Sequence, residues 1–150
     1  MLVMSSLQPF YANGLAFECT RCSACCRHDP GYVFLSQNDL DKLCAHSGMS
    51  ESDFRKKYCR VVDFGIVKRL SLIEKKNFDC VFWEGDGCSV YAARPLQCRA
   101  FPFWMQNVES AENWQSVAQD CPGVNRGKVH DRAIIESWLN SRLNESPLED

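Results

Sequence analysis

The sequence has no long hydrophobic run, no excess of positive charge and no repeated or low-complexity segment. No apolar stretch approaches the roughly 18 residues that a membrane-spanning helix needs, so we predict no membrane partner. Seventeen Lys and Arg residues against 19 Asp and Glu residues give a net charge of −2. Because such a balance leaves no basic field for a phosphate backbone, we predict no nucleic-acid partner.

The common catalytic and targeting motifs are also missing. The chain has no phosphate-binding glycine loop, no Gly-x-Ser-x-Gly elbow, no His-Glu-x-x-His motif and no Asp-rich calcium loop. Its first ten residues contain neither Lys nor Arg and no sustained apolar segment, so they do not resemble a secretory signal. We therefore expect a cytoplasmic protein whose thiols stay reduced.

The rest of the composition is that of an ordinary globular protein, with one exception. The 150 residues are 45% hydrophobic and 24% charged, which fits a single domain over residues 1–150. The exception is the presence of ten cysteines. In a reducing compartment, closely spaced cysteines indicate metal or redox chemistry more often than disulfides or unpaired thiols.

Local sequence patterns predict short helices and hairpins rather than long elements. Capping signals and apolar spacing predict helices near 37–46, 51–59 and 128–144. β-branched residues predict one or two strands over 61–73, interrupted at Gly65. Glycine-containing turns predict one hairpin around 84–87, and a second hairpin is expected around 109–112, between 101–107 and 113–118. The predicted fold class is α+β: a small single domain of short helices and hairpins organised around a cysteine-ligated metal centre.

Four cysteines fall within eight residues near the N-terminus: Cys19, Cys22, Cys25 and Cys26. Cys-x-x-Cys spacing lets the chain turn so that both thiolates point inward, and two overlapping pairs supply three ligands from one loop. The same run occurs around four-iron clusters of bacterial ferredoxins, where a further ligand is followed by proline. Cys121 is followed by Pro122, so it is the candidate for the fourth ligand.

Cys26 need not share a centre with its neighbour, because successive side chains of an extended backbone point to opposite sides. We hypothesise that Cys26 joins the downstream cysteines Cys80, Cys88 and Cys98, which would give two four-thiolate sites. A single centre with unused or bridging thiols is the alternative. The cysteine core would then extend over about 17–127.

Other residues near the cysteines have plainer interpretations. Cys44 and Cys59 fall on predicted helices and are interpreted as small buried hydrophobes rather than ligands. His28 could replace a thiolate in a mixed zinc site, although a loop imidazole is the simpler interpretation. Four arginines close to cluster cysteines suit either an outer shell around thiolates or ordinary solvated positions: Arg21, Arg27, Arg94 and Arg99.

The cysteine pattern, taken with its surroundings, resembles the CxxCxxCC (YkgJ-like) family of zinc- or iron-chelating proteins. Three segments carry the resemblance: Cys19-Thr-Arg-Cys22-Ser-Ala-Cys25-Cys26, Cys88-Ser-Val-Tyr91-Ala-Ala-Arg94-Pro95-Leu-Gln-Cys98-Arg99-Ala-Phe101-Pro102-Phe103, and Cys121-Pro122-Gly123, with Cys80 between the first and second. One departure is Ser23, where many relatives have glycine.

The resemblance implies a metal-binding protein and leaves zinc and iron open. We favour an iron–sulfur cluster in a redox or electron-transfer role, with structural zinc as the alternative. Longer relatives include flagellin lysine N-methylases, so a protein-modifying enzyme is a second hypothesis, although no added region that could hold a methyl donor is apparent. A third is an accessory module that delivers metal to a protein partner.

Overall fold

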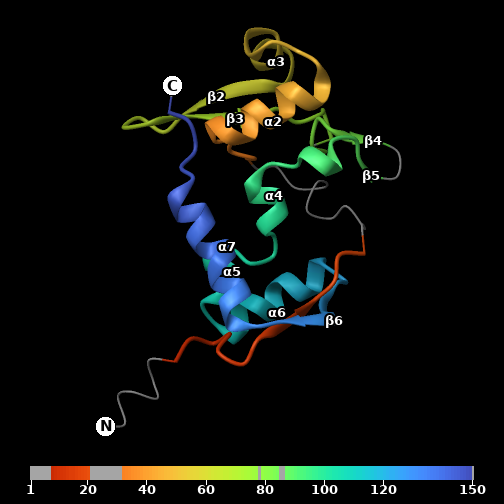
Figure 1. Cartoon of the computed structure of the whole chain (residues 1–150), viewed down its shortest axis with the longest axis vertical. Helices are drawn as coiled ribbons and strands as arrows, with labels where there is room; N and C mark the ends of the chain where they lie inside the picture. Colours follow the sequence, from red (N-terminus) through yellow and green to blue (C-terminus); the bar gives the residue numbers. More distant parts are fainter. Residues whose placement is uncertain (1–7, 21–31, 78, 85–86, 150) are drawn as a thin grey trace. The chain divides into compact units, whose positions relative to one another are not determined.

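The computed structural model describes residues 8–20, 32–77, 79–84 and 87–149, in which helices alternate with small antiparallel sheets (Figure 1). This mixture confirms the predicted α+β class. The chain divides into two compact units: Met1–Cys22 with Ala100–Ser141, and Ser23–Arg99 with Arg142–Asp150. A single domain over residues 1–150 stays a prediction. None of the described helices combines the length and apolar character needed to cross a membrane.

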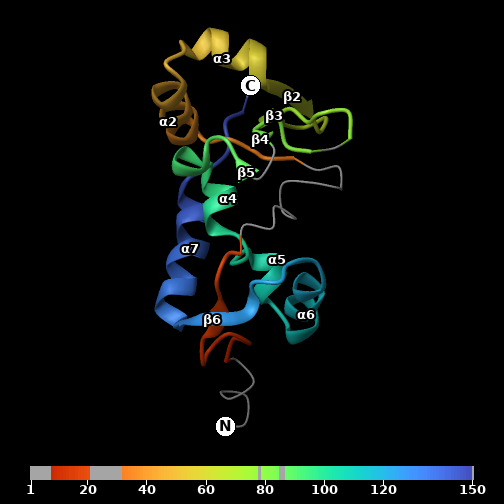
Figure 2. The ribbon, with the colours of Figure 1, turned by 90° about the vertical axis from the view of Figure 1, so that its right-hand side faces the viewer.

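The first unit is built around a two-stranded ladder. β1 (Leu15–Phe17) pairs antiparallel with β6 (Val124–His130), and its register shifts after Ala16. Two helices, α5 (Met105–Val108) and α6 (Ala111–Asp120), pack beside the ladder (Figure 2). Apolar side chains of this unit form one buried cluster: Tyr11, Leu15, Phe103, Val108, Trp114, Cys121, Val124, Ile135 and Leu139.

The predicted hairpin over 101–118 is wrong, because this segment forms α5 and α6. Ser110 is the N-cap of α6, and its side chain accepts a hydrogen bond from Asn113 N–H at 3.1 Å. Trp114 and Val117 follow at helical spacing, and Trp114 is almost completely buried. The capping serine and the helical spacing were the signals that a hairpin interpretation overlooked.

The C-terminal helix is shorter than the predicted 128–144. α7 spans Arg132–Asn144, whereas residues 128–130 belong to β6. The Asp131 carboxylate accepts a hydrogen bond from Ile134 N–H at 2.9 Å, which is the N-cap arrangement that marks where a helix begins. The strand before it is paired with β1, a partner more than a hundred residues away along the chain.

The second unit contains both predicted N-terminal helices. α2 (Gln37–Ser47) begins with a capping box between Ser36 and Asp39 and ends at Gly48, whose φ of 70° suits glycine. α3 (Glu51–Tyr58) begins at Ser50, whose side chain accepts a hydrogen bond from Asp53 N–H. The structure confirms both helices to within a residue or two of the predicted ends.

The predicted strands of the second unit are also confirmed. β2 (Cys59–Asp63) and β3 (Lys68–Leu72) form an antiparallel hairpin, and Gly65 in its turn has a φ of 88°. β4 (Trp83–Glu84) and β5 (Gly87–Cys88) form the hairpin predicted around 84–87, with much shorter strands than expected. The helix η2 (Tyr91–Ala93) and α4 (Leu96–Ala100) follow. The core of this unit consists of Leu35, Leu40, Leu43, Phe54, Leu70, Leu72, Phe82, Val90 and Ala93.

Candidate metal centre

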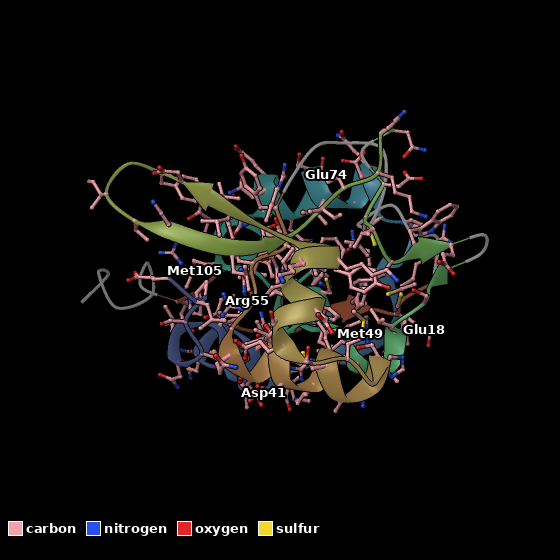
Figure 3. All side chains as sticks on the ribbon, turned by 90° about the horizontal axis from the view of Figure 1, so that it is seen from above. Glu18, Asp41, Met49, Arg55, Glu74 and Met105 are labelled. Atoms are coloured by element: carbon pink, nitrogen blue, oxygen red, sulfur yellow. The ribbon has the colours of Figure 1, made fainter. Side chains whose placement is uncertain are left out.

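The β1–β6 ladder brings Cys19 and Cys121 to the same end of the first unit. Beyond the last ladder pair, Glu18 N–H donates a hydrogen bond to the Gly123 carbonyl at 3.1 Å. Cys19 directly follows Glu18, and Cys121 lies two residues before Gly123. Glu18 is labelled in Figure 3. The fold thus places the start of the Cys-x-x-Cys run beside the remote Cys-Pro-Gly segment.

Gly123 is essential to this approach. A β-carbon at this position would collide with the backbone carbonyl of Glu18 and would press against the Phe17 ring. Only glycine lets the two chain segments come this close. Gly123 is visible in the sequence as part of Cys121-Pro122-Gly123, but its need for close approach to Glu18 becomes visible only in the fold.

Cys121 is buried, whereas Cys19 is exposed. Cys121 is the C-cap of α6, and its N–H donates to the Val117 carbonyl at 2.9 Å. Its carbonyl accepts from Val124 N–H at 3.2 Å, and its side chain belongs to the buried core. The geometry therefore fixes the buried thiol of the pair before any metal is considered.

Three further predicted ligands lie in the second unit: Cys88 in the β4–β5 hairpin, Cys80 just before it, and Cys98. Cys88 pairs with Trp83 across this hairpin, and Trp83 N–H donates to the Cys80 carbonyl at 2.9 Å. Cys80 also forms an isolated antiparallel bridge with Glu74. The side chains of Cys80 and Cys88 are partly buried against the core of this unit.

The third of these residues, Cys98, lies in the single turn of α4. Its N–H donates to the Pro95 carbonyl at 3.0 Å. The beginning of α4 is tied to α2, because the buried carboxylate of Asp39 accepts a hydrogen bond from Leu96 N–H at 2.9 Å. A carboxylate in the first turn of α2 therefore positions the helix that carries Cys98.

Two of the four arginines predicted near the cysteines are described, and both hold the backbone around η2. The Arg94 guanidinium lies 3.8 Å from the centroid of the Tyr91 ring, and Arg94 Nε donates to the Tyr91 carbonyl. Arg99 Nε donates to the Arg94 carbonyl at 3.1 Å. Their nearest described partners are thus the backbone carbonyls and the ring of the segment that leads to Cys98.

Arg142 is a cation near Cys98 that the sequence analysis missed. Burial lowers the pKa of the Arg142 guanidinium, and the negative charge of the nearby Cys98 thiolate opposes this change. Arg142 lies in the last turn of α7, and it lines a small cavity together with Asp39 and Gln97. No spacing rule connects residues 98 and 142, so this neighbour becomes visible only in the fold.

The two cysteines interpreted as buried hydrophobes, Cys44 and Cys59, both have raised thiol pKa values. Burial raises the pKa of the Cys59 thiol to about 11, with a smaller lowering effect of Arg55. Burial also raises the pKa of Cys44, and the carboxylates of Glu51 and Asp41 add to the effect. Because metals bind thiolates, a raised pKa disfavours both thiols as ligands.

The remaining predicted ligands, Cys22, Cys25 and Cys26, lie outside the described residues, as does His28. Among the residues that the structure describes, no three Cys, His, Asp or Glu side chains form a group that could hold a metal ion. In particular, Cys80, Cys88 and Cys98 do not form such a group by themselves. Each predicted four-thiolate site includes at least one cysteine of the segment 21–31, so both ligand sets stay predictions.

The donor set nevertheless fits zinc or an iron–sulfur cluster. The predicted ligands are all cysteines, which are the donors of four-thiolate zinc sites and of iron–sulfur clusters. Of the five that are described, four are partly or fully buried: Cys80, Cys88, Cys98 and Cys121. Burial keeps a ligated thiolate away from competing water.

Comparison with known proteins gives the same chemistry. The family model CxxCxxCC, described as "Putative zinc- or iron-chelating domain", matches residues 18–122. An uncharacterised protein of Methanocaldococcus jannaschii is 31% identical over 98 residues, which are 64% of this chain and 50% of that protein. The chain thus spans about half the length of this curated relative. No solved structure matches the chain.

Proposed function

The chain belongs to the CxxCxxCC family of zinc- or iron-chelating domains, and from this premise we propose that its cysteines bind an iron–sulfur cluster in a redox role. Metal chelation is the property that the family description supports. The choice of an iron–sulfur cluster rather than zinc, and the redox role, are our proposals. We also propose a reducing, cytoplasmic environment, because the ligands must remain thiols.

The observation that carries the proposal is the contact between Glu18 and Gly123. It supports a site formed by Cys19, Cys22 and Cys25 together with Cys121. Three cysteines from one loop and a remote cysteine followed by proline are the ligand pattern of four-iron clusters. Such a cluster, when bound, would supply one-electron transfer. The exposed position of Cys19 suits electron exchange with a protein partner.

The second proposed site uses Cys26 with Cys80, Cys88 and Cys98. Trp83 supports a shared role for Cys80 and Cys88, because it pairs with Cys88 across the β4–β5 hairpin and donates its N–H to the Cys80 carbonyl. Arg142 supports Cys98 as a thiolate, because a neighbouring guanidinium favours the charged form of the ligand. The alternative metal, zinc, would make such a closed site structural.

The experiment that tests the proposal is purification without oxygen, followed by a visible spectrum and measurement of iron, zinc and acid-labile sulfide. We expect a brown protein that dithionite bleaches, with iron and sulfide in similar amounts. A colourless protein with stoichiometric zinc would replace the cluster by a structural zinc site. A protein with neither metal would contradict metal binding altogether. The matched control is Cys44→Ser, which should retain the colour of the parent.

A further inference from the structure

The outer edge of β2 is unpaired in the described part of the chain. β2 pairs with β3, and no other described strand lies against it. The far side of β3 is occupied by another extended segment, since Leu35 N–H donates to the Leu70 carbonyl at 3.1 Å. β2 contains no proline, glycine or bulge. Proteins usually block such an edge, because it is a template for another strand.

Two hydrogen bonds show which backbone groups face outward. Phe64 N–H donates to the Val67 carbonyl at 2.9 Å beside the turn. Ile73 N–H donates to the Tyr58 carbonyl at 2.9 Å at the base of the hairpin. Since bonded and non-bonded pairs alternate in an antiparallel ladder, the N–H and carbonyl of Val61 point away from β3.

One face of the same sheet carries aromatic rings and arginines. The Phe64 ring centroid lies 6.0 Å from the Tyr32 ring and 6.0 Å from the Phe34 ring. The guanidinium of Arg60 lies 5.2 Å from the Tyr32 ring centroid. The guanidinium of Arg69 lies 6.0 Å from the Phe34 ring centroid. We call these five residues the aromatic–arginine face.

Exposed hydrophobic side chains concentrate around this face and edge. Of the nine large hydrophobic residues that are exposed within the described ranges, four lie here: Tyr32 at 44%, Val61 at 45%, Phe64 at 49% and Ile66 at 100%. Isolated exposed apolar residues are normal, but several of them on one hairpin and its neighbouring segment, beside an open strand edge, are typical of an interaction surface.

The charges of this region favour an acidic partner. Three cations lie on the hairpin, at Arg60, Lys68 and Arg69, against a single acidic residue, Asp63, although the whole chain has a net charge of −2. A second copy paired through β2 would bring two sets of arginines together, which like-charge repulsion opposes. Guanidinium groups already lie over two of the three rings, so stacked nucleotide bases would have to displace them.

The sheet already binds an extended acidic segment of its own chain. Leu70 N–H donates to the Leu148 carbonyl at 3.2 Å, and Leu148 N–H donates to the Leu35 carbonyl at 2.7 Å. The next residue, Glu149, forms an antiparallel bridge with Arg69. A leucine followed by a glutamate is thus accommodated by backbone pairing next to an arginine of the aromatic–arginine face.

We propose that the outer edge of β2 binds an extended, acidic segment of a partner protein by strand addition. Backbone pairing with Val61 would supply the affinity, and Arg60 would select carboxylates on the added strand. Apolar side chains of the same segment would cover the exposed Phe64 and Ile66. This surface is independent of the proposed metal ligands, so its test does not depend on the identity of the metal.

The test selects random displayed peptides, each long enough to form one strand, on the metal-loaded protein. The most enriched peptide is then synthesised, and its affinity is measured by fluorescence anisotropy. We expect enriched peptides with net negative charge and alternating apolar residues. Val61→Pro should weaken binding at least about fivefold, because it removes an outward N–H without taking a hydrogen bond from β3. Val61→Thr keeps that N–H and should bind like the parent.

The charge variants keep the test decisive if the proline variant fails to fold. Arg60→Glu should weaken binding of the acidic peptide about tenfold. Arg126 is an exposed arginine of the first unit, and Arg126→Glu should leave that binding unchanged. Enrichment of basic peptides, no enrichment, or equal binding to the Arg60→Glu and parent proteins would overturn the proposal. So would tighter binding of oligothymidylate than of the peptide, which would assign the face to single-stranded nucleic acid.

Discussion

The two places where the described cysteines gather differ in how much protein structure supports them. Cys121 lies in a packed core at the end of a ten-residue helix, and the β1–β6 ladder leads to Cys19. Cys80 and Cys88 lie on or beside strands of two residues, and Cys98 lies in a helix of five. Such short elements gain little stability from their own hydrogen bonds. The first pair is therefore positioned by packing, whereas the second set depends more on a crosslink.

Metal removal should have the largest effect, and it should affect the two places that hold cysteines differently. We expect a chelator to abolish amide protection across 79–84 and 87–98, because the crosslink that stabilises these short elements is lost. Protection in β1 and β6 should persist, because the buried core around Trp114 does not require a ligand. Hydrogen exchange of loaded and stripped protein measures both segments at once. Equal loss of protection in the two segments would contradict the difference between them.

Gly123→Ala should have a smaller effect, confined to the first unit. The added methyl group meets the Glu18 carbonyl, so we expect a loss of about 1–3 kcal/mol in the free energy of unfolding. The amount of metal bound by the site that contains Cys121 should fall as well. Gly87→Ala is the matched control, because a β-carbon there meets no atom within 4 Å and no positive φ is required. Urea unfolding and metal content measure the two effects; equal stability of the two variants would rule out the close approach.

Substitution of Cys59 should have the smallest effect. It tests whether this cysteine of the second unit is a packed thiol rather than a metal ligand. Burial raises the pKa of Cys59 from 9.0 to about 11, so between these values the folded protein holds a proton that the unfolded chain releases. Stability from this thiol is therefore complete below pH 9 and is lost as the pH rises toward 11. Cys59→Ser should flatten the alkaline decline seen by urea unfolding. An unchanged decline would mean that Cys59 does not titrate with a raised pKa.

The sequence was most informative where the signals were local. Ser36 and Asp39 form a capping box three residues apart, and Gly65 marks the turn between two β-branched segments, so these elements could be predicted with good bounds. β6 could not, because its partner β1 lies at the opposite end of the chain. In 101–118 the capping residue Ser110 and the helical spacing of Trp114 and Val117 were present, but the hairpin prediction did not use them.

The candidate site shows the same division. Cysteine spacing was enough to propose Cys121 as a partner of the N-terminal run, and the fold places it at the end of the ladder that leads to Cys19. The role of Gly123 in that approach, and the proximity of Arg142 to Cys98, depend on contacts between distant segments. Spacing within a sequence carries no information about such contacts.

The most direct test of two separately supported metal sites is the metal content per chain of three cysteine variants, each purified without oxygen. We predict that Cys121→Ser loses the metal of one site and Cys88→Ser loses that of the other, while Cys44→Ser retains both. The double variant Cys121→Ser/Cys88→Ser should then retain none. A uniform partial loss in the two single variants, or no loss in either of them, would contradict the account.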